Sequence, residues 1–409
     1  WQGYREHVLP AFTYHNQVDD LGMQVARKLY GSPLRSSVSR LEQYASCPFA
    51  HFISYGLSPG ERKLYEVASP DIGLLFHNAL MSYAQKIRSA DMTWQGLDRE
   101  DSDVLMDQVM EELAPELADG VFASTHRYRY LLKRLQRVGR RTAWILVQHI
   151  KAGDFQPVAV ELGFGTGRAL PALEIELPNG EMLYLEGRID RVDIFDDAKE
   201  SFVRIIDYKT GGKSFDLADA YNGLSLQLLL YLQAVLNAPQ QIGRERLNPA
   251  GVFYFKIDDP LVKSDKDIME EVEKQIAQKL KMDGVLLKDV RIIRAMDVNA
   301  DTGSHIIPAA ITSNGEVHRQ SSVLEESEFA ALLQHMRELV KKMGLEIIQG
   351  RVRINPVRNE KGNACIYCNY KSICQFDPLF EDNRYRNLRS LKREEIINLL
   401  VRPVQEAEE

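Results

Sequence analysis

The sequence predicts an α/β protein with a mixed central sheet flanked by helices. Helical periodicity dominates residues 37–151, an antiparallel run of strands follows at 157–209, and a helix and a further buried strand come next. This order fits a mixed sheet better than a doubly wound dinucleotide fold. With 409 residues, of which 44% are hydrophobic and 27% charged, the chain is long enough to bury a large core.

Four helical patterns form the first part of the chain. The first begins at a serine that can cap a helix and is interrupted at Cys47-Pro48. The second begins with Ser-Pro-Asp at 69–71, where proline fits the first turn of a helix. The approximate bounds of the four are 37–55, 69–83, 98–117 and 128–151.

Strand patterns replace the helical ones after Pro157. Apolar residues alternate in VAVELGFG, LEIEL, MLYLEGRIDRVDIF and SFVRIIDYK, and a PNGE turn and a charged turn separate the later segments. Beyond them we expect a helix at 217–236, a buried strand at 250–256, and amphipathic helices at 264–282 and 325–348.

The net charge of −7 argues against a protein that coats nucleic acid over its whole surface, so any nucleic-acid site must be a local patch. The best candidate is the face formed by Arg134, Arg137 and Arg141, which recur at helical spacing. These arginines either track a phosphate backbone, with neighbouring tyrosines stacking on bases, or form an ordinary solvated helix face.

No apolar run approaches the roughly 18 residues that a membrane helix needs, and the start of the chain lacks a signal-peptide pattern. We therefore expect a cytoplasmic protein with no membrane partner. The chain begins with Trp1 and not with methionine, and its first segment has no clear period. We interpret it as a piece of a longer chain or as a chain whose start is missing.

The segment IIDYKTGGKSFD at 205–216 supports two different catalytic interpretations. A phosphate-binding loop requires a glycine five residues before the Gly-Lys-Ser at 212–214. That position is Asp207, whose carboxylate would repel phosphate, so GGKS is better interpreted as a turn that leaves a strand. By the same test of spacing, GFGTGR at 163–168 is a strand end and not a dinucleotide-binding fingerprint.

The other interpretation is a metal-dependent nuclease. Asp207 and Lys209 point to the same side of a strand, and the hairpin formed with GRIDRVD would bring Asp190 beside Asp207. Two close carboxylates repel each other unless a divalent cation such as Mg²⁺ lies between them, and a neighbouring lysine can position or deprotonate a water. The competing interpretation is a pair of ordinary strand carboxylates with a solvated lysine.

Neighbouring residues strengthen the nuclease interpretation. Gln227 and Tyr231 lie four residues apart on a leucine-rich helix, where they could cover the site and touch a nucleic-acid backbone. His77 lies on the flank of an apolar helix and could bind the same metal, although a single histidine there is also compatible with a core position. Glu161 is an additional candidate for an outer carboxylate.

Taken in order, Gly73 to His77, GRID, DYK and the Gln-Tyr helix resemble the RecB-like branch of the PD-(D/E)-x-K nucleases. The resemblance implies Mg²⁺-dependent cleavage of single strands into short oligonucleotides, with His77, Asp190 and Asp207 binding the metal. An aspartate at 207 departs from the more common glutamate and shortens the reach to the metal by one methylene. The catalytic set that the resemblance implies is Asp190, Asp207, Lys209, Gln227 and Tyr231.

All four cysteines have spacings that suggest metal binding. Cys365, Cys368 and Cys374 form C-x₂-C-x₅-C, and Cys47 lies far upstream in ASCPF. Disulfides are not expected in a reducing cytosol, so we interpret these thiols as ligands. Three clustered cysteines with one remote cysteine before proline favour a [4Fe–4S] cluster, and zinc is the alternative.

A nuclease core between one early cysteine and three late ones resembles the iron-staple nuclease domain of the AddB family, the second subunits of bacterial AddAB helicase–nucleases. The phrases SVSRLEQYASCPFAHF, DIGLLFHNAL and CIYCNYKSICQFDP carry this likeness. It implies a nuclease domain at 37–378 whose [4Fe–4S] cluster joins its amino- and carboxyl-terminal parts. Residues 1–36 would then be a linker from a helicase-like region, and 379–409 a tail.

The resemblance further implies processing of double-strand DNA ends for recombination, in which the domain cuts the 5′-ended strand that an AddA-like partner subunit feeds to it. The competing class is a non-catalytic iron–sulfur scaffold that holds a DNA strand and docks on a helicase partner. Such a scaffold would be free to lose Asp190 or Lys209, and the chain has both together with His77 and Gln227.

Overall fold

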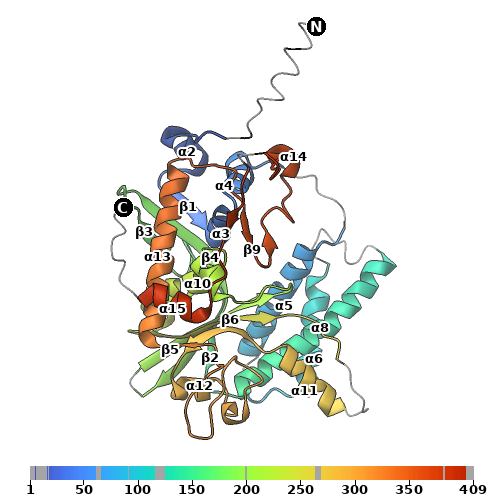
Figure 1. The fold of residues 1–409 in the computed structure, drawn as a ribbon. Coiled ribbons are helices and arrows are strands. Elements are labelled where there is room, and N and C mark those ends of the chain that lie inside the picture. Colours follow the sequence, from blue (N-terminus) through green and yellow to red (C-terminus); the bar gives the residue numbers. More distant parts are fainter. Residues whose placement is uncertain are drawn as a thin grey trace.

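A mixed sheet forms the centre of the computed structural model, which describes residues 5, 16, 18–60, 66–90, 92–115, 125–198, 200–262, 269–380 and 383–401. Its strands are β1 (Leu34–Ser37), β2 (Gln156–Phe164), β3 (Leu173–Glu176), β4 (Met182–Asp197), β5 (Glu200–Lys209), β6 (Asn248–Lys256), β7 (Asp283–Leu287) and β8 (Val323–Leu324). The order is β1-β4-β5-β6-β7-β8, and β2 and β3 also pair with β4 (Figure 1). Parallel and antiparallel neighbours both occur, so the predicted mixed sheet is confirmed.

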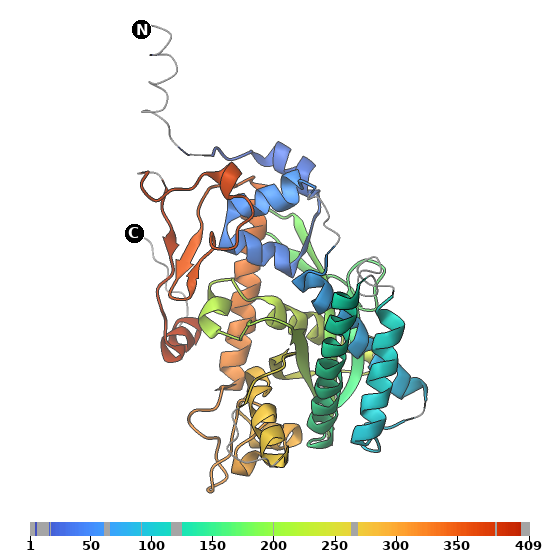
Figure 2. The same ribbon diagram turned by 90° about the vertical axis from the view of Figure 1, so that its right-hand side faces the viewer.

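Helices cover both faces of this sheet (Figures 1 and 2). One face packs against α2 (Met23–Tyr30), α3 (Val38–Ser46), α9 (Leu217–Tyr221), α10 (Gln227–Leu236), α13 (Glu326–Ile348) and α15 (Arg393–Val401). The other packs against α5 (Ser69–Ser89), α6 (Arg99–Leu113), α8 (His126–Lys151), α11 (Met269–Lys279) and α12 (Val290–Met296). No helix in the described part of the chain is both long and apolar enough to cross a membrane.

A smaller unit with its own three-stranded sheet lies near α3. Its strands are β9 (Val357–Asn359), β10 (Gly362–Asn363) and β11 (Arg386–Asn387), in the order β10-β9-β11. The short helix α4 (Pro48–His51) and the π-helical turn Phe52–Leu57 follow α3, and α14 (Lys371–Cys374) lies close to α4 in both ribbon views. Two 3₁₀ turns, Pro239–Ile242 and Ala300–Thr302, complete the described helical elements.

The alternation of side chains along β5 determines which residues face which helices. Val203 and Ile205 enter the core on the α10 side, whereas Phe202 and Ile206 enter the core on the α5 and α8 side. Asp207 lies two residues after Ile205 and therefore points to the same side of the strand. It therefore faces α10 at the end of the strand.

Three predicted helices differ in detail. The helix expected at 217–236 is two helices, because the chain turns at 222–226 and Gly223 adopts a left-handed φ of 81°. The second helix begins at Ser69 as predicted, but its N-cap is Ala68, whose backbone N–H donates to the Asp71 carboxylate at 2.8 Å. Of the helix expected at 264–282, residues 264–268 lie outside the described part of the chain.

Candidate active site

Asp190 and Asp207 lie side by side on adjacent strands. In the antiparallel pairing of β4 with β5, Arg191 is opposite Ile206, and the next step of this register places Asp190 opposite Asp207. The backbone N–H of Tyr208 donates to Asp190 Oδ2 at 2.7 Å. The two residues are only 6% and 1% exposed, so the hairpin holds two carboxylates together out of water.

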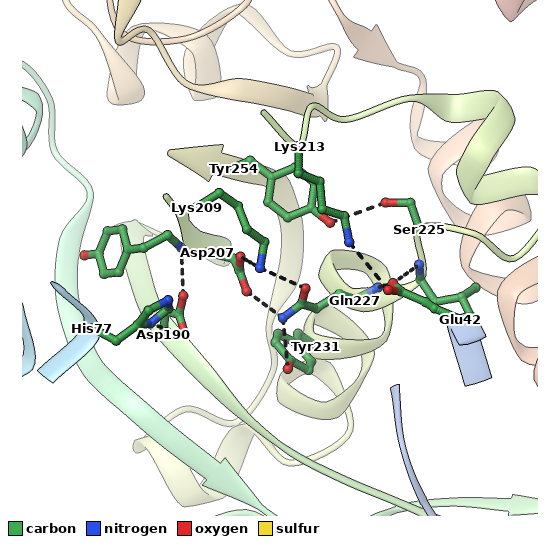
Figure 3. A network of polar contacts seen from close by, with 12 residues as sticks. Glu42, His77, Asp190, Asp207, Lys209, Lys213, Ser225, Gln227, Tyr231 and Tyr254 are labelled. Carbon is green, nitrogen blue, oxygen red and sulfur yellow. Dashed lines mark hydrogen bonds and ion pairs between the residues drawn. The ribbon is translucent and has the colours of Figure 1, made fainter. Parts of the chain in front are cut away.

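Asp207, Lys209 and Gln227 form a closed ring of polar contacts (Figure 3). The Lys209 ammonium forms an ion pair with Asp207 Oδ2 and donates to Gln227 Oε1 at 3.1 Å. The Gln227 amide nitrogen completes the ring by donating to Asp207 Oδ1 at 2.7 Å. Because Gln227 presents its oxygen to the ammonium and its nitrogen to the carboxylate, it fixes the position of both groups.

Tyr231 holds Gln227 in place on the side away from Lys209 (Figure 3). Its hydroxyl accepts a hydrogen bond from Gln227 Nε2 at 3.2 Å, and its ring packs edge-on against Phe164. A Cβ atom on Gly187 would lie 2.8 Å from the Phe164 ring and 3.3 Å from the Tyr231 ring, so only glycine leaves room for both. Tyr231 is 8% exposed and therefore shapes the site from within rather than from its surface.

The ring lies beside a second carboxylate, that of Asp190. Burial and the neighbouring charge of Asp190 raise the pKa of Asp207 to about 7, although Lys209 and His77 act in the opposite direction. A bound cation would lower the free-energy cost of ionising this buried carboxyl group. A raised carboxyl pKa of this kind is expected at a metal site.

His77, Glu161 and Asp190 form a group of potential metal ligands. His77 Nδ1 lies 3.3 Å from Asp190 Oδ1 and 3.5 Å from Glu161 Oε1, and the three ligand atoms lie within 4.8 Å of one another. Burial alone would lower the pKa of His77, but its contacts with the two carboxylates outweigh burial and raise it to about 10. One imidazole and two carboxylates suit a divalent cation.

The position of Asp207 differs from the expected ligand set. We expected Asp207 to join His77 and Asp190, but its oxygens contact Lys209 and Gln227, and Glu161 takes the third place in the group. Glu161 also has a left-handed φ of 51° within β2, which is a costly conformation for a residue with a side chain. Such strain is commonly retained at functional positions, so Glu161 is a stronger candidate than its sequence indicated.

Sequence reasoning missed two charged residues beside the ring. Lys213, the lysine of GGKS, lies with its Nζ 5.4 Å from the centre of the Tyr254 ring, as does Lys209 Nζ. Its ammonium is 3.5 Å from Glu42 Oε2, a side chain of α3 (Figure 3). The GGKS pattern pointed to the loop, whereas nothing in the sequence around Glu42 connects it to this site.

The sequence profile of the PD-(D/E)XK nuclease superfamily matches residues 35–375. The chain belongs to this superfamily. It is also similar to proteins named as the B subunit of an ATP-dependent helicase/deoxyribonuclease, with 44% identity over 406 residues in Alkaliphilus metalliredigens, 46% over 397 in Alkaliphilus oremlandii and 40% over 404 in Geobacillus kaustophilus. These alignments cover 97–99% of this chain, which spans about a third (35%) of the length of each relative.

In this PD-(D/E)XK chain, the cysteines from the two ends of the sequence meet. Cys47 is the C-cap of α3 and packs in one apolar cluster with Cys374. Cys365, Cys368 and Cys374 line a cavity of about 340 Å³, and all four thiols are free. Burial, followed by the nearby thiols, raises the pKa of Cys374 to about 11 and also raises that of Cys365. Four such sulfurs suit a bound cationic metal centre, which stabilises thiolates.

The three predicted DNA-binding arginines of this PD-(D/E)XK chain lie on α8. Arg134 and Arg137 are exposed and Arg141 is half-buried. Arg137 and Arg141 both form ion pairs with Asp259, in the loop that follows β6. The sequence did not indicate this partner, and it neutralises part of the charge of the face.

Proposed function

We propose that this chain is a Mg²⁺-dependent deoxyribonuclease domain that hydrolyses phosphodiester bonds in single-stranded DNA. The observation that carries the proposal is the position of the Lys209 ammonium. Asp207 and Gln227 hold it at the end of β5, where Asp207 lies opposite Asp190 of the His77–Glu161–Asp190 group and burial raises the pKa of Asp207. The likeness to RecB-like nucleases assigns roles in the site to these residues other than Glu161 and also to Tyr231.

His77, Glu161 and Asp190 would hold the metal, with Asp207 beside them. A bound divalent cation supplies charge stabilisation at a phosphodiester and lowers the pKa of a bound water. Lys209 then orients the attacking water and stabilises negative charge that develops on the phosphate. Gln227 keeps the ammonium aimed at the site, and Tyr231 keeps Gln227 in place.

The named relatives suggest the wider context of this activity. Each is called the B subunit of an ATP-dependent helicase/deoxyribonuclease, so we propose that this domain works with an AddA-like helicase–nuclease partner in the bacterial cytoplasm. The substrate would be single strands at double-strand DNA ends, and the domain would cut the 5′-ended strand during recombinational repair.

Cleavage of end-labelled single-stranded DNA by the 409-residue chain tests the proposal. We expect Mg²⁺ to release short oligonucleotides, and both EDTA and Asp207→Ala to stop the release. The same comparison is repeated with the partner subunit present. If Asp207→Ala leaves the cleavage pattern unchanged in both settings, the chain is a DNA-binding scaffold and the proposal is wrong.

We also propose that Cys47, Cys365, Cys368 and Cys374 hold a [4Fe–4S] cluster that acts as a staple. Linking the early cysteine to the late ones closes a loop of roughly 320 residues, for which chain entropy allows a stabilisation of about 5–6 kcal/mol. An absorption spectrum with iron and sulfide analysis distinguishes this cluster from zinc. Cys47→Ala should lose the chromophore and lower the melting temperature sharply, and a variant that keeps the parent's Tm would overturn the staple.

A further inference from the structure

The helix that carries Gln227 begins without a cap of its own. Its N-cap residue is Leu226, whose side chain has no acceptor, so the first backbone N–H groups need a partner elsewhere. Glu42 supplies it from α3. Its Oε1 atom accepts from the backbone N–H of Leu226 at 2.8 Å and from that of Gln227 at 3.1 Å.

The position of this helix start determines the geometry of the catalytic ring. Gln227 is the first residue of α10, and its side chain bonds to Asp207, Lys209 and Tyr231. The chain before it turns at 222–226, where regular helical hydrogen bonds are interrupted. A small shift of the first turn would therefore move the Gln227 amide away from the ammonium and the carboxylate that it holds.

The second oxygen of Glu42 lies near the other side of the ring. Lys213, 3.5 Å from Glu42 Oε2, belongs to the loop that directly follows Lys209 at the end of β5. One carboxylate thus contacts both segments that lead to the ring, the start of α10 and the loop after β5 (Figure 3). Glu42 itself belongs to a nine-residue helix that ends at Cys47.

We infer that Glu42 is a positioning residue for the catalytic ring, which rests on the proposed nuclease function. It fixes Gln227 by accepting the two backbone N–H groups and thereby holds Lys209 and Asp207 in their reactive arrangement. The simpler explanation is a helix cap that contributes only to stability. The two explanations differ in what happens to kcat when the cap is removed.

Glu42→Ala tests the inference against a matched cap on a distant helix. Asp98 caps α6 by accepting from the Asp101 N–H at 2.8 Å, so Asp98→Ala removes a comparable contact away from the ring. We expect both variants to lower Tm by a few degrees. Only Glu42→Ala should lower kcat at saturating Mg²⁺, by roughly 10–100-fold with KM within about twofold, because small misplacements of catalytic groups are costly.

Glu42→Gln separates the acceptor from the charge. A glutamine keeps one oxygen that can accept both N–H groups and loses the ion pair with Lys213, so it should restore most of kcat. If Glu42→Ala and Asp98→Ala have the same kcat as the parent, Glu42 is only a structural cap. If Glu42→Gln is as slow as Glu42→Ala, then the ion pair between Glu42 and Lys213, and not the contact with the helix start, maintains kcat.

Crystal structures of the parent and of Glu42→Ala test the inference without relying on activity. We expect the Gln227 side chain to leave Asp207 and Lys209 in the variant, and an unchanged ring would overturn the inference. An inactive parent protein, in contrast, would contradict the proposed nuclease function while leaving this structural comparison intact.

Discussion

Two buried groups of charged side chains lie on opposite faces of β4 and β5, and their charge balance differs. On the α8 side, Asp193 accepts from Arg191 at 2.6 and 2.7 Å and from Arg204 at 2.9 Å, and none of the three side chains is more than 3% exposed. On the α10 side, the carboxylates of Asp190 and Asp207 lie together with that of Glu161 nearby, and the cations that contact them are Lys209, His77 and Arg188.

The difference separates a structural use of buried charge from a functional one. Both oxygens of Asp193 are bonded by guanidinium groups, and Asp193 and Tyr208 raise the pKa of Arg191 even though burial lowers it. The protein alone therefore satisfies both oxygens of Asp193. At Asp207, in contrast, burial and the neighbouring Asp190 raise the pKa to about 7, and a buried carboxyl group that is costly to ionise is typical of a site that binds a cation.

The largest effect is expected on cleavage when the group of Asp190, Asp207 and Lys209 is changed. Asp207→Asn, Asp190→Asn and Lys209→Met should each lower kcat by about 10³-fold or more, because each removes a group at the reacting centre. Asp196→Asn, which changes a half-exposed carboxylate on the same strand as Asp190, is the control. A nuclease assay measures the loss of kcat, and thermal melting checks that each variant is folded. Parent-like cleavage by any of the three variants would show that the active site lies elsewhere.

The group of Asp193 with its two arginines should respond in stability and not through the metal. Asp193→Asn leaves two buried guanidinium groups without their carboxylate, so we expect the free energy of unfolding to fall by about 3–5 kcal/mol. Asp196→Asn loses only a surface pair with Arg244, which is worth about 1 kcal/mol or less. Urea denaturation compares the two. Equal losses would mean that the buried group does not carry the stability assigned to it.

The pH dependence of stability should distinguish Asp207 from ordinary carboxylates. Below about pH 3.8 its carboxyl group is protonated in both the folded and the unfolded chain. Between 3.8 and about 7 only the unfolded chain readily loses the proton, so the folded protein loses stability as pH rises, by up to about 1.4 kcal/mol per pH unit. Above about 7 the loss is complete.

Comparison with a non-titrating variant isolates this contribution. In EDTA, the stability of Asp207→Asn relative to the parent should increase from pH 5 to pH 7 and stay constant from 7 to 8. For Asp196→Asn the difference should be flat over this range, because its pKa is lowered by Arg244. Urea midpoints at each pH provide the measurement, and a flat difference for Asp207→Asn would show that its carboxyl group is not destabilised by burial.

Local patterns predicted much of this architecture, and some contacts between distant segments, such as that of Glu42, were missed. The period of two along 182–209 predicted a hairpin that brings Asp190 to Asp207, because register follows from alternation and turn position. The turn at 222–226 was missed because the leucine-rich pattern continues across it. The contact of Glu42 with the start of α10 depends on how two helices pack. The partners are 184 positions apart in the sequence, so no local periodicity indicates this contact.

The α8 surface repeats the stoichiometry of the Asp193 group, one aspartate with two arginines, in a more exposed setting. Asp259 pairs with both Arg137 and Arg141, as Asp193 pairs with two arginines, but the Arg137 side chain is 57% exposed whereas that of Arg191 is 3% exposed. An exposed pair contributes about 0–1 kcal/mol, so these arginines can exchange Asp259 for a phosphate at little cost. Their role in DNA binding is therefore expected to be small and additive.

Salt dependence of single-strand binding tests this smallest effect. In an Asp207→Asn background with EDTA, changing Arg134, Arg137 and Arg141 to alanine should flatten the plot of log affinity against log salt by about 0.7 for each phosphate that is no longer neutralised. Asp259→Asn should tighten binding a few-fold, because it frees two guanidinium groups to bind phosphates. Fluorescence anisotropy with a labelled oligonucleotide measures both. An unchanged slope would show a solvated helix face, and weaker binding by Asp259→Asn would show that Asp259 orients the arginines for DNA and does not compete with it.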